Sequence, residues 1–215
     1  MIKKCVICLV CVIIVGLFIY NTCINDSTTI SIVGDILLAR GVGKEIDKNG
    51  FDYPYEKTKS ILTSDDITIG NLECTITSGE EHAIKKPTIV FKSDEENARA
   101  LKEAGFDVLS LGNNHTMDYL SYGLKDTMEN LQKNNIGYTG ARENSYSDIE
   151  PYIIKKKGKK IGILGYNTLP IEGEFFSEDG VRVTLLPVFV TVSTVTVPWV
   201  GFVIVVLYVF LLNHM

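Results

Sequence analysis

Three short apolar segments, each followed by polar residues and separated by helical patterns, constrain the fold of this chain most strongly. Residues 29–33, 66–69 and 107–111 are rich in β-branched and large apolar residues, which predicts strands. Apolar residues recur at helical spacing in residues 98–104 and 124–131, which predicts helices. Strands that alternate with helices are typical of a layered α/β domain. We therefore expect an α/β fold for the middle of the chain.

Turn and capping residues indicate where one predicted helix begins and ends. Ser93 with Glu96 three residues later fits a capping box before the helix at residues 98–104, and Gly105 predicts its end. Residues 55–62 predict a further short helix. The segment at residues 74–88 is polar and is expected to be irregular.

Two strand-like runs in the second half predict a β-hairpin. They lie at residues 152–156 and 160–164 and flank Gly158, which suits a tight turn. Residues 136–138 predict a short extended segment before them.

The N-terminal segment differs from the middle of the chain because it is apolar. Lys3 and Lys4 precede an unbroken apolar run at residues 5–20, a pattern typical of a signal peptide or an uncleaved anchor. No small-residue cleavage pattern follows, so we expect residues 1–24 to be an uncleaved signal anchor, with a cleaved signal peptide as the alternative. The positive-inside rule then keeps the lysines in the cytoplasm and places the following domain outside the cell membrane.

The C-terminal segment, residues 181–215, is an apolar, valine-rich tail. Residues 183–212 contain no charged residue. Residues 188–197 alternate like a strand, whereas residues 199–212 are apolar enough to enter a membrane and begin with a tryptophan suited to its interface. The tail is therefore either a second membrane span or a segment unrelated to the preceding domain, such as a frameshifted end.

Polar residues that can bind a metal follow the three predicted strands. They are Asp35, then Asn71 with Glu73, and then the segment Asn113-Asn114-His115 with Asp118 close behind. An α/β sheet commonly carries its site beyond the carboxyl ends of its strands. Carboxylate and amide oxygens with one imidazole suit Mn, Mg, Fe or Zn ions. Taken singly, each group is also compatible with a solvated acid or a hydrogen-bonded loop.

Three motifs together resemble a known family. Residues 31–40, 69–73 and 105–118 read SIVGDILLAR, IGNLE and GFDVLSLGNNHTMD, and they are similar to the CapA family of capsule and poly-γ-glutamate synthesis proteins. Tyr138-Thr-Gly140 continues the similarity, which extends over about residues 29–168. The resemblance implies a membrane-anchored protein with its domain outside the cell, linked to assembly or export of anionic capsule polymers. It also implies a fold similar to calcineurin-like metallophosphoesterases, with residues 25–180 as its N-terminal part.

The resemblance also implies roles for individual residues. Asp35, Glu73 and Asn114 would be metal ligands. His115 would face the substrate, where it would stabilise charge on a phosphoryl oxygen or protonate a leaving group. Asp118 would orient His115 through a hydrogen bond.

Three further residues are candidates for substrate binding. Arg40 would hold an anionic substrate, although a surface ion pair is an equally good reading of an exposed arginine. Asn71 and Asn113 would contact the substrate from the same edge of the sheet.

The chain departs from the family pattern in its histidines. The wider superfamily has a histidine at the position of Leu37, and CapA-like proteins share its absence. The family continues with histidine-rich motifs that supply further ligands, but this chain has only His82, His115 and His214. His82 lies in the irregular loop, where it is expected to be solvent-exposed. We therefore expect a domain that is incomplete at its C-terminal side and a metal centre that is incompletely coordinated.

These observations lead to three functional hypotheses. The first is an extracellular, membrane-anchored, CapA-like protein of capsule or poly-γ-glutamate synthesis that contacts the anionic polymer or other subunits of the export complex. The alternatives are a metal-dependent phosphoesterase-type hydrolase and a non-functional truncated product, so enzymatic activity is left open. Half of such a fold would expose an apolar sheet face. The net charge of −5 and the isoelectric point of about 5.3 argue against nucleic acid as a partner.

Overall fold

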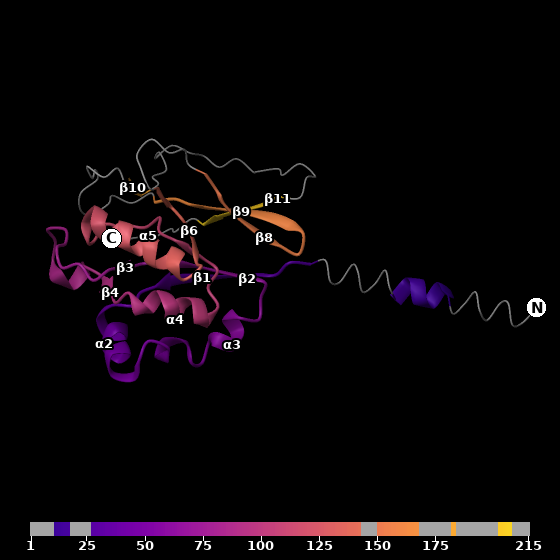
Figure 1. Cartoon of the computed structure of the whole chain (residues 1–215), viewed down its shortest axis with the longest axis horizontal. Helices are drawn as coiled ribbons and strands as arrows, with labels where there is room; N and C mark the ends of the chain where they lie inside the picture. Colours follow the sequence, from indigo (N-terminus) through magenta and orange to yellow (C-terminus); the bar gives the residue numbers. More distant parts are fainter. Residues whose placement is uncertain (1–10, 18–26, 143–149, 168–181, 184–201, 208–215) are drawn as a thin grey trace, which may run out of the picture.

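Four parallel strands in the order β1-β2-β5-β6 form the central sheet (Figure 1). They are β1 (Ile30–Ile36), β2 (Ile67–Leu72), β5 (Val108–Ser110) and β6 (Gly137–Thr139). The structure, a computed structural model, describes residues 11–17, 27–142, 150–167, 182–183 and 202–207. The predicted α/β fold is confirmed, and the structure shows that its central sheet is parallel. Each strand predicted between residues 29 and 164 lies within two or three residues of its observed bounds.

Helices cover one face of this sheet (Figure 1). They are α2 (Arg40–Asn49), α3 (Lys59–Leu62), α4 (Glu96–Ala104) and α5 (Leu120–Lys133), with 3-10 turns η1 (Tyr53–Tyr55) and η2 (Pro87–Ile89) between them. Leu101, Leu124 and Leu131 are fully buried and form one core cluster with Leu109 of β5. In α5, the apolar residues predicted at helical spacing, Leu124, Met128 and Leu131, all lie on the buried face, which confirms that prediction.

The start of α4 differs from the predicted capping box. Ser93 lies in the short strand β4 (Lys92–Ser93), and the N-cap is Glu95, whose side chain makes no capping bond. The preceding Asp94 accepts a hydrogen bond at its Oδ1 from the Glu96 N–H at 2.8 Å. An aspartate can close an Asx turn of this kind over its own i+2 N–H, which releases the serine to the strand. Gly105 ends the helix with φ of 112°, in the left-handed region, as predicted.

Two local elements were not predicted. Helix α2 was missed because only Val42 and Ile46 mark an apolar face, and of these only Ile46 is buried. Strand β3 (Thr75–Ile76) pairs in parallel with β4, so the segment predicted to be irregular begins with a short buried ladder. The hydrogen bonds of so short a ladder depend on a partner far along the chain, which local patterns do not reveal.

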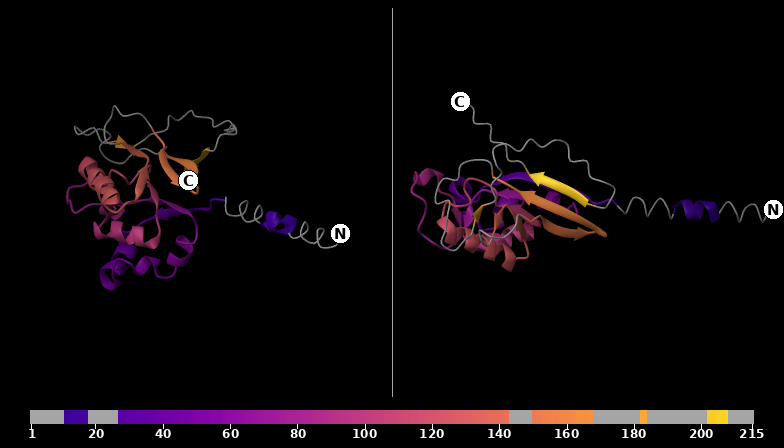
Figure 2. Two further views of the ribbon diagram at one scale, coloured as in Figure 1. Left: turned by 45° about the vertical axis from the view of Figure 1, so that its right-hand side comes forward. Right: turned by 90° about the horizontal axis from the view of Figure 1, so that it is seen from above.

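A second sheet covers the opposite face of the central sheet, as two views show (Figures 1 and 2). Strands β8 (Tyr152–Lys156) and β9 (Lys159–Gly165) form the predicted antiparallel hairpin, with Gly158 at φ of 73° in the turn. Ile161 and Ile163 of β9 pack on Ile67 and Ile69 of β2 and on neighbouring Val108. The expectation of an exposed apolar sheet face is therefore wrong at the centre of the sheet, because the hairpin covers it, although Ile32 on β1 is 50% exposed.

Two strands come from the valine-rich tail. β10 (Arg182–Val183) pairs antiparallel with β7 (Ala141–Arg142), and β11 (Phe202–Leu207) pairs in parallel with β9. Residues 202–207 thus form a strand, in keeping with their β-branched composition. A second membrane span in the tail stays a prediction. The rest of the tail lies outside the described residues.

The predicted N-terminal anchor is described only in part. Residues 11–17 are helical. Across the described ranges, no helix combines the length and the apolar character needed to cross a bilayer.

Candidate functional site

The register of the central sheet aligns four polar residues near its carboxyl edge. Asp35 of β1 pairs with Asn71 of β2, Asn71 with Ser110 of β5, and Ser110 with Thr139 of β6. Parallel strands end at the same edge, so the segments that follow them also meet there. Glu73 follows β2 directly, and its N–H donates to the carbonyl of Ile36 at 3.0 Å. The predicted convergence of the strand-end residues is thus present.

A chain of amides links the first strand to the turn after β5. Asn71 Nδ2 donates to Asp35 Oδ1 at 2.8 Å, and Asn113 Nδ2 donates to Asn71 Oδ1 at 3.1 Å. Asn113 Oδ1 in turn accepts the His115 N–H at 3.0 Å. Both amides are 3% exposed. Their contacts give them a positioning role, because they fix the Asp35 carboxylate relative to the His115 backbone; contact with a substrate stays a prediction for both.

The His115 ring is held by a buried network. Its Nδ1 lies 3.0 Å from Asp118 Oδ2, the predicted contact. Asp118 is completely buried, and its Oδ2 also accepts the Phe91 N–H at 2.7 Å while Oδ1 accepts from Lys85 Nζ. The His115 ring stacks on that of Phe91 with centroids 4.2 Å apart. Because the ionised Asp118 carboxylate can only accept hydrogen bonds, Nδ1 of His115 is the donor in this contact. The other ring nitrogen, Nε2, faces Glu73 at the sheet edge.

Glu73 faces this histidine and lies beside Asp35. Glu73 Oε1 is 4.0 Å from His115 Nε2. Burial, followed by the neighbouring Asp35 carboxylate, raises the pKa of Glu73 to about 7, although the charge of His115 acts in the opposite direction. Two carboxylates that adjoin in a partly desolvated place are unfavourable as a doubly ionised pair. The edge therefore has a local excess of negative charge that a proton or a cation relieves.

Arg40 begins α2 at the border of this site. Its Cζ lies 5.8 Å from the centroid of the Phe91 ring, the same ring on which His115 stacks. Arg40 makes no ion pair with any described residue, and both its role in holding an anionic substrate and the alternative of a surface ion pair stay predictions. Its φ of 56° is in the left-handed region, where a non-glycine residue is strained.

The remaining predicted residues have different environments. Asn114 is half-buried, and its side chain makes no hydrogen bond within the described part of the chain, so its amide oxygen is available as a ligand. His82 is exposed and its Nδ1 lies 2.9 Å from the Ala83 carbonyl, as expected for a loop residue. His214 lies outside the described residues. Lys85 and Phe91 were missed from the sequence because neither belongs to a periodic segment or to a motif.

The donor set at the edge fits a divalent metal only in part. Asp35, Glu73 and the Asn114 amide supply hard oxygen atoms of the kind that Mn and Mg prefer, and the imidazole extends this to Fe and Zn. Within the ranges that the structure describes, no three His, Cys, Asp or Glu side chains gather as a metal-binding group. Incomplete coordination of a metal at this edge stays a prediction.

The raised pKa of Glu73 leads to a prediction about stability. The folded-state pKa of about 7 lies above the ordinary value of 4.5, so the protonated group stabilises the fold below pH 4.5 and this contribution is lost as the pH rises through 7. We expect the melting temperature of the metal-free protein to fall between about pH 5 and pH 8, and Glu73→Gln to remove most of that fall. Thermal unfolding of wild type and of Glu73→Gln, with a chelator present and repeated across this pH range, measures how steeply each melting temperature changes with pH.

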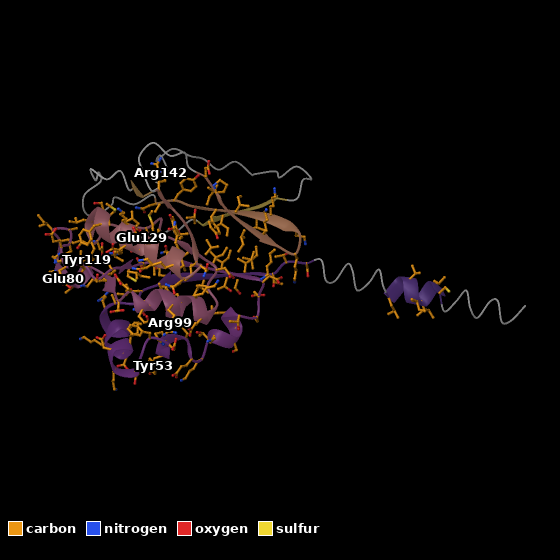
Figure 3. All side chains as sticks on the ribbon, viewed as in Figure 1. Tyr53, Glu80, Arg99, Tyr119, Glu129 and Arg142 are labelled. Atoms are coloured by element: carbon orange, nitrogen blue, oxygen red, sulfur yellow. The ribbon has the colours of Figure 1, made fainter. Side chains whose placement is uncertain are left out.

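A matched variant controls this measurement. Glu129→Gln changes an exposed carboxylate on α5, where Glu129 is labelled in Figure 3, and it should keep the wild-type pH slope. An identical slope in wild type and Glu73→Gln would contradict the prediction.

The fold and the site together define a mixed α/β protein with paired carboxylates and an Asn-His turn at the carboxyl edge of a parallel sheet. The family model described as bacterial capsule synthesis protein PGA_cap matches residues 29–182. This chain belongs to that family, which confirms the resemblance to CapA proteins.

Named relatives agree with the family. The chain is 30% identical over 158 residues to the capsule biosynthesis protein CapA of Bacillus anthracis, covering 72% of this chain and 38% of the relative. It is 32% identical over 151 residues to the PGA biosynthesis protein CapA of Bacillus subtilis, covering 69% and 40%. A probable polyglutamine synthesis accessory protein of Mycobacterium tuberculosis is 28% identical over 149 residues, covering 54% and 39%. The chain thus spans about two fifths of the length of these relatives.

A solved structure with partial similarity is the NAD nucleotidase of Haemophilus influenzae. It is 17% identical, covers 62% of this chain and 23% of its own, and superposes with a TM-score of 0.40. Similarity at this level does not define a shared fold.

Proposed function

We propose that this protein is a component of capsule or poly-γ-glutamate synthesis or export, anchored in the cell membrane by residues 1–24 with its domain outside. Support comes from the names of the relatives, which are a capsule biosynthesis protein and a PGA biosynthesis protein. The basic residues before the apolar run at residues 5–20 support the anchor and its orientation. The anionic polymer, or other subunits of the same complex, would be its partners.

A second part of the proposal concerns metal binding, and the observation that carries it is the position of Asp35 beside Glu73, which faces the oriented His115. We infer that this edge binds a divalent cation through Asp35, Glu73 and Asn114. Such a cation supplies electrostatic stabilisation of a negatively charged group. The excess negative charge that raises the pKa of Glu73 favours a cation there.

His115 then has a defined position relative to an anionic group at this edge. Lys85 and the Phe91 N–H fix the position of Asp118, and Asp118 contacts Nδ1 of His115. Rotation of the imidazole ring would therefore break its buried hydrogen bond to Asp118. Its Nε2 is left to contact the bound group, as a hydrogen-bond donor when protonated. Arg40, whose guanidinium lies near the Phe91 ring, would bind a further negative charge of the same polymer.

The second candidate function is metal-dependent hydrolysis of a phosphoester. The oriented His115 favours it, because an imidazole held by a carboxylate can protonate a leaving group. In that case Asp118 would act as the residue that positions the histidine. A non-functional truncated product is the third reading, and absence of both metal binding and polymer would favour it.

A titration with Mn²⁺ tests the proposed cation site directly. We expect the full chain to bind Mn²⁺, and Asp35→Asn to weaken binding by at least about 100-fold, since even loss of a residue that only supports a ligand costs about 10–100-fold. Calorimetric titration of Mn²⁺ measures the change, and Glu129→Gln is the matched control. Equal affinity in wild type and Asp35→Asn would remove this edge as the metal site.

Two further assays separate the candidate functions. Deletion of the gene and complementation with wild type or Asp35→Asn, followed by measurement of the capsule polymer, tests the role in synthesis; polymer restored equally by both would contradict a role for the metal edge. Turnover of a generic phosphodiester with Mn²⁺ that disappears in His115→Ala would establish the hydrolase instead.

A further inference from the structure

The turn of the hairpin β8–β9 concentrates positive charge in a chain whose net charge is −5. Residues 155–160 read KKKGKK, and in the register of the hairpin Lys155 pairs with Lys160 and Lys156 pairs with Lys159. Lys155, Lys156 and Lys160 are exposed and make no ion pair with any residue that the structure describes. We call the lysines of residues 155–160 the basic turn.

The two opposed lysine pairs are unfavourable for the hairpin itself, because like charges that face each other across a β-ladder repel. Lysines on an edge strand protect it from pairing with other chains. That role accounts for Lys155 and Lys156, since β8 is an edge strand. It does not account for Lys159 and Lys160, because β9 lies between β8 and β11 in its sheet. The basic turn is therefore better explained by an anionic partner that relieves the repulsion.

Lys157 fixes the basic turn beside the N-terminal end of the domain. Its Nζ donates to the carbonyl of Ser27 at 3.1 Å and to Asp66 Oδ2 at 2.7 Å. Its φ of 47° is in the left-handed region, which a two-residue hairpin turn of this kind requires but which lysine rarely adopts. Figures 1 and 2 show the turn at the end of the domain where β1 begins. The basic turn thus has a fixed position next to the start of β1.

The acidic residues at the same end of the sheet do not cancel this charge. Asp66 pairs with Lys157 at 2.7 Å, and Asp107, directly before β5, pairs with Lys102 at 3.2 Å. Asp65 accepts a hydrogen bond from a serine hydroxyl of β1. One carboxylate without an ion pair among these acids, against the remaining lysines of the basic turn, leaves an excess of positive charge.

The partner that this position favours is a membrane surface. The proposed anchor ends at residue 24, and the three residues from there to Ser27 span at most about 11 Å when fully extended. Electrostatic attraction acts over about 8–10 Å at physiological ionic strength, so charges this close to a bilayer are attracted by its headgroups. A soluble polymer has no comparable reason to bind here, because the candidate cation site lies at the opposite, carboxyl edge of the sheet.

We propose that the basic turn is a second membrane contact, in which its lysines bind the headgroups of anionic phospholipids. The position of the contact rests on the proposed anchor at residues 1–24, whereas the attraction depends on the lysines alone. From this end of the domain β1 runs for seven residues, about 20 Å, to the carboxyl edge. The contact therefore directs Asp35, Glu73 and His115 away from the bilayer.

Residue-resolved acetylation tests the contact with the full chain reconstituted into two kinds of vesicle. One contains phosphatidylcholine, which is zwitterionic, and the other an equimolar mixture with phosphatidylglycerol, which is anionic. Trace acetylation located by mass spectrometry should be about fivefold slower at Lys155, Lys156 and Lys160 in the anionic vesicles, the attraction expected for one lysine at such a surface. Exposed Lys125 and Lys133 on α5 should react equally in both, and high salt should abolish the difference. Equal rates at the basic turn in both vesicles would overturn the proposal.

Paired substitutions assign the protection to the lysines of the hairpin. Lys155→Gln/Lys160→Gln removes one opposed pair and should reduce the protection of Lys156 to about twofold or less, since each lysine near the surface contributes separately. Lys125→Gln/Lys133→Gln removes the same charge from α5 and should leave Lys156 fully protected. Equal protection of Lys156 in the two double variants would show that the net charge of the chain, and not the basic turn, is responsible.

Three outcomes separate this contact from the proposed anchor and from polymer binding. Flotation of the chain with phosphatidylcholine vesicles, without lipid-dependent protection, would keep the anchor and overturn the basic turn. Flotation with anionic vesicles alone, with the basic turn protected, would overturn the anchor and support the contact. Protection of the same lysines by soluble polyglutamate and not by phosphatidylglycerol would overturn the membrane contact in favour of a polymer.

Discussion

Lys85→Met is expected to reduce the free energy of unfolding by about 3–5 kcal/mol, the largest effect of any single substitution outside the apolar core. Asp118 is completely buried and the Lys85 side chain is 7% exposed, so the ion pair between them is shielded from water. Removal of the lysine leaves a buried carboxylate with hydrogen bonds but without its counter-charge. The melting temperature should fall by about 10 °C at this domain size.

Comparison with other variants separates the buried charge from the loss of a side chain. Lys133→Met removes an exposed lysine 3.9 Å from Glu129 and should change stability by less than about 1 kcal/mol. The double variant Lys85→Met/Asp118→Asn should recover part of the loss, because it removes the unpaired charge as well. Equal melting temperatures for Lys85→Met and Lys133→Met would show that the pair contributes nothing.

Gly140→Ala should have the second largest effect. Gly140 follows β6 with φ of 86°, and a Cβ there would lie 2.4 Å from the backbone nitrogen of Gly112 and 2.7 Å from its Cα. Left-handed backbone costs alanine about 1–2 kcal/mol, and the clash with backbone atoms adds to it. We expect a total loss of about 3 kcal/mol or more, measured by denaturant unfolding.

Gly158→Ala is the matched control for this substitution. Gly158 also has a left-handed φ, 73°, but a Cβ there would meet nothing within 4 Å. It should therefore lose only the backbone part, about 1–2 kcal/mol. Gly140→Ala should in addition weaken Mn²⁺ binding, because Gly112 directly precedes the turn that contains Asn114 and His115. Equal losses of stability in the two variants would mean that the close approach to Gly112 has no energetic consequence.

The elements predicted correctly are those with strong local signals. β5 lies in a short contiguous apolar run, and α5 has apolar residues at helical spacing. Gly105 and Gly158 terminate their segments because only glycine adopts a left-handed φ readily. The capping box at Ser93 was wrong because Ser93 pairs with Ile76 of strand β3, a partner that the local sequence does not reveal. The neighbouring Asp94 accepts the Glu96 N–H in its place.

The candidate site likewise contains residues that the sequence predicted and residues that it did not. Asp35, Glu73 and His115 are predictable because polar residues that directly follow strands of a parallel sheet must meet at one edge. Lys85 was not predictable as part of the site, because its pairing with Asp118 joins positions 33 residues apart.

The sequence by itself therefore determined the family, the α/β class of the fold and the polar residues that follow its strands, since each depends on local periodicity or on contiguous motifs. Only the tertiary structure decided that the hairpin β8–β9 covers the second face of the sheet, that Asp118 pairs with Lys85, and that Arg40 lies near the Phe91 ring. The physical reason is that burial and unpaired charge depend on which segments become neighbours. That choice depends on the packing of the whole chain and is not encoded within any one segment.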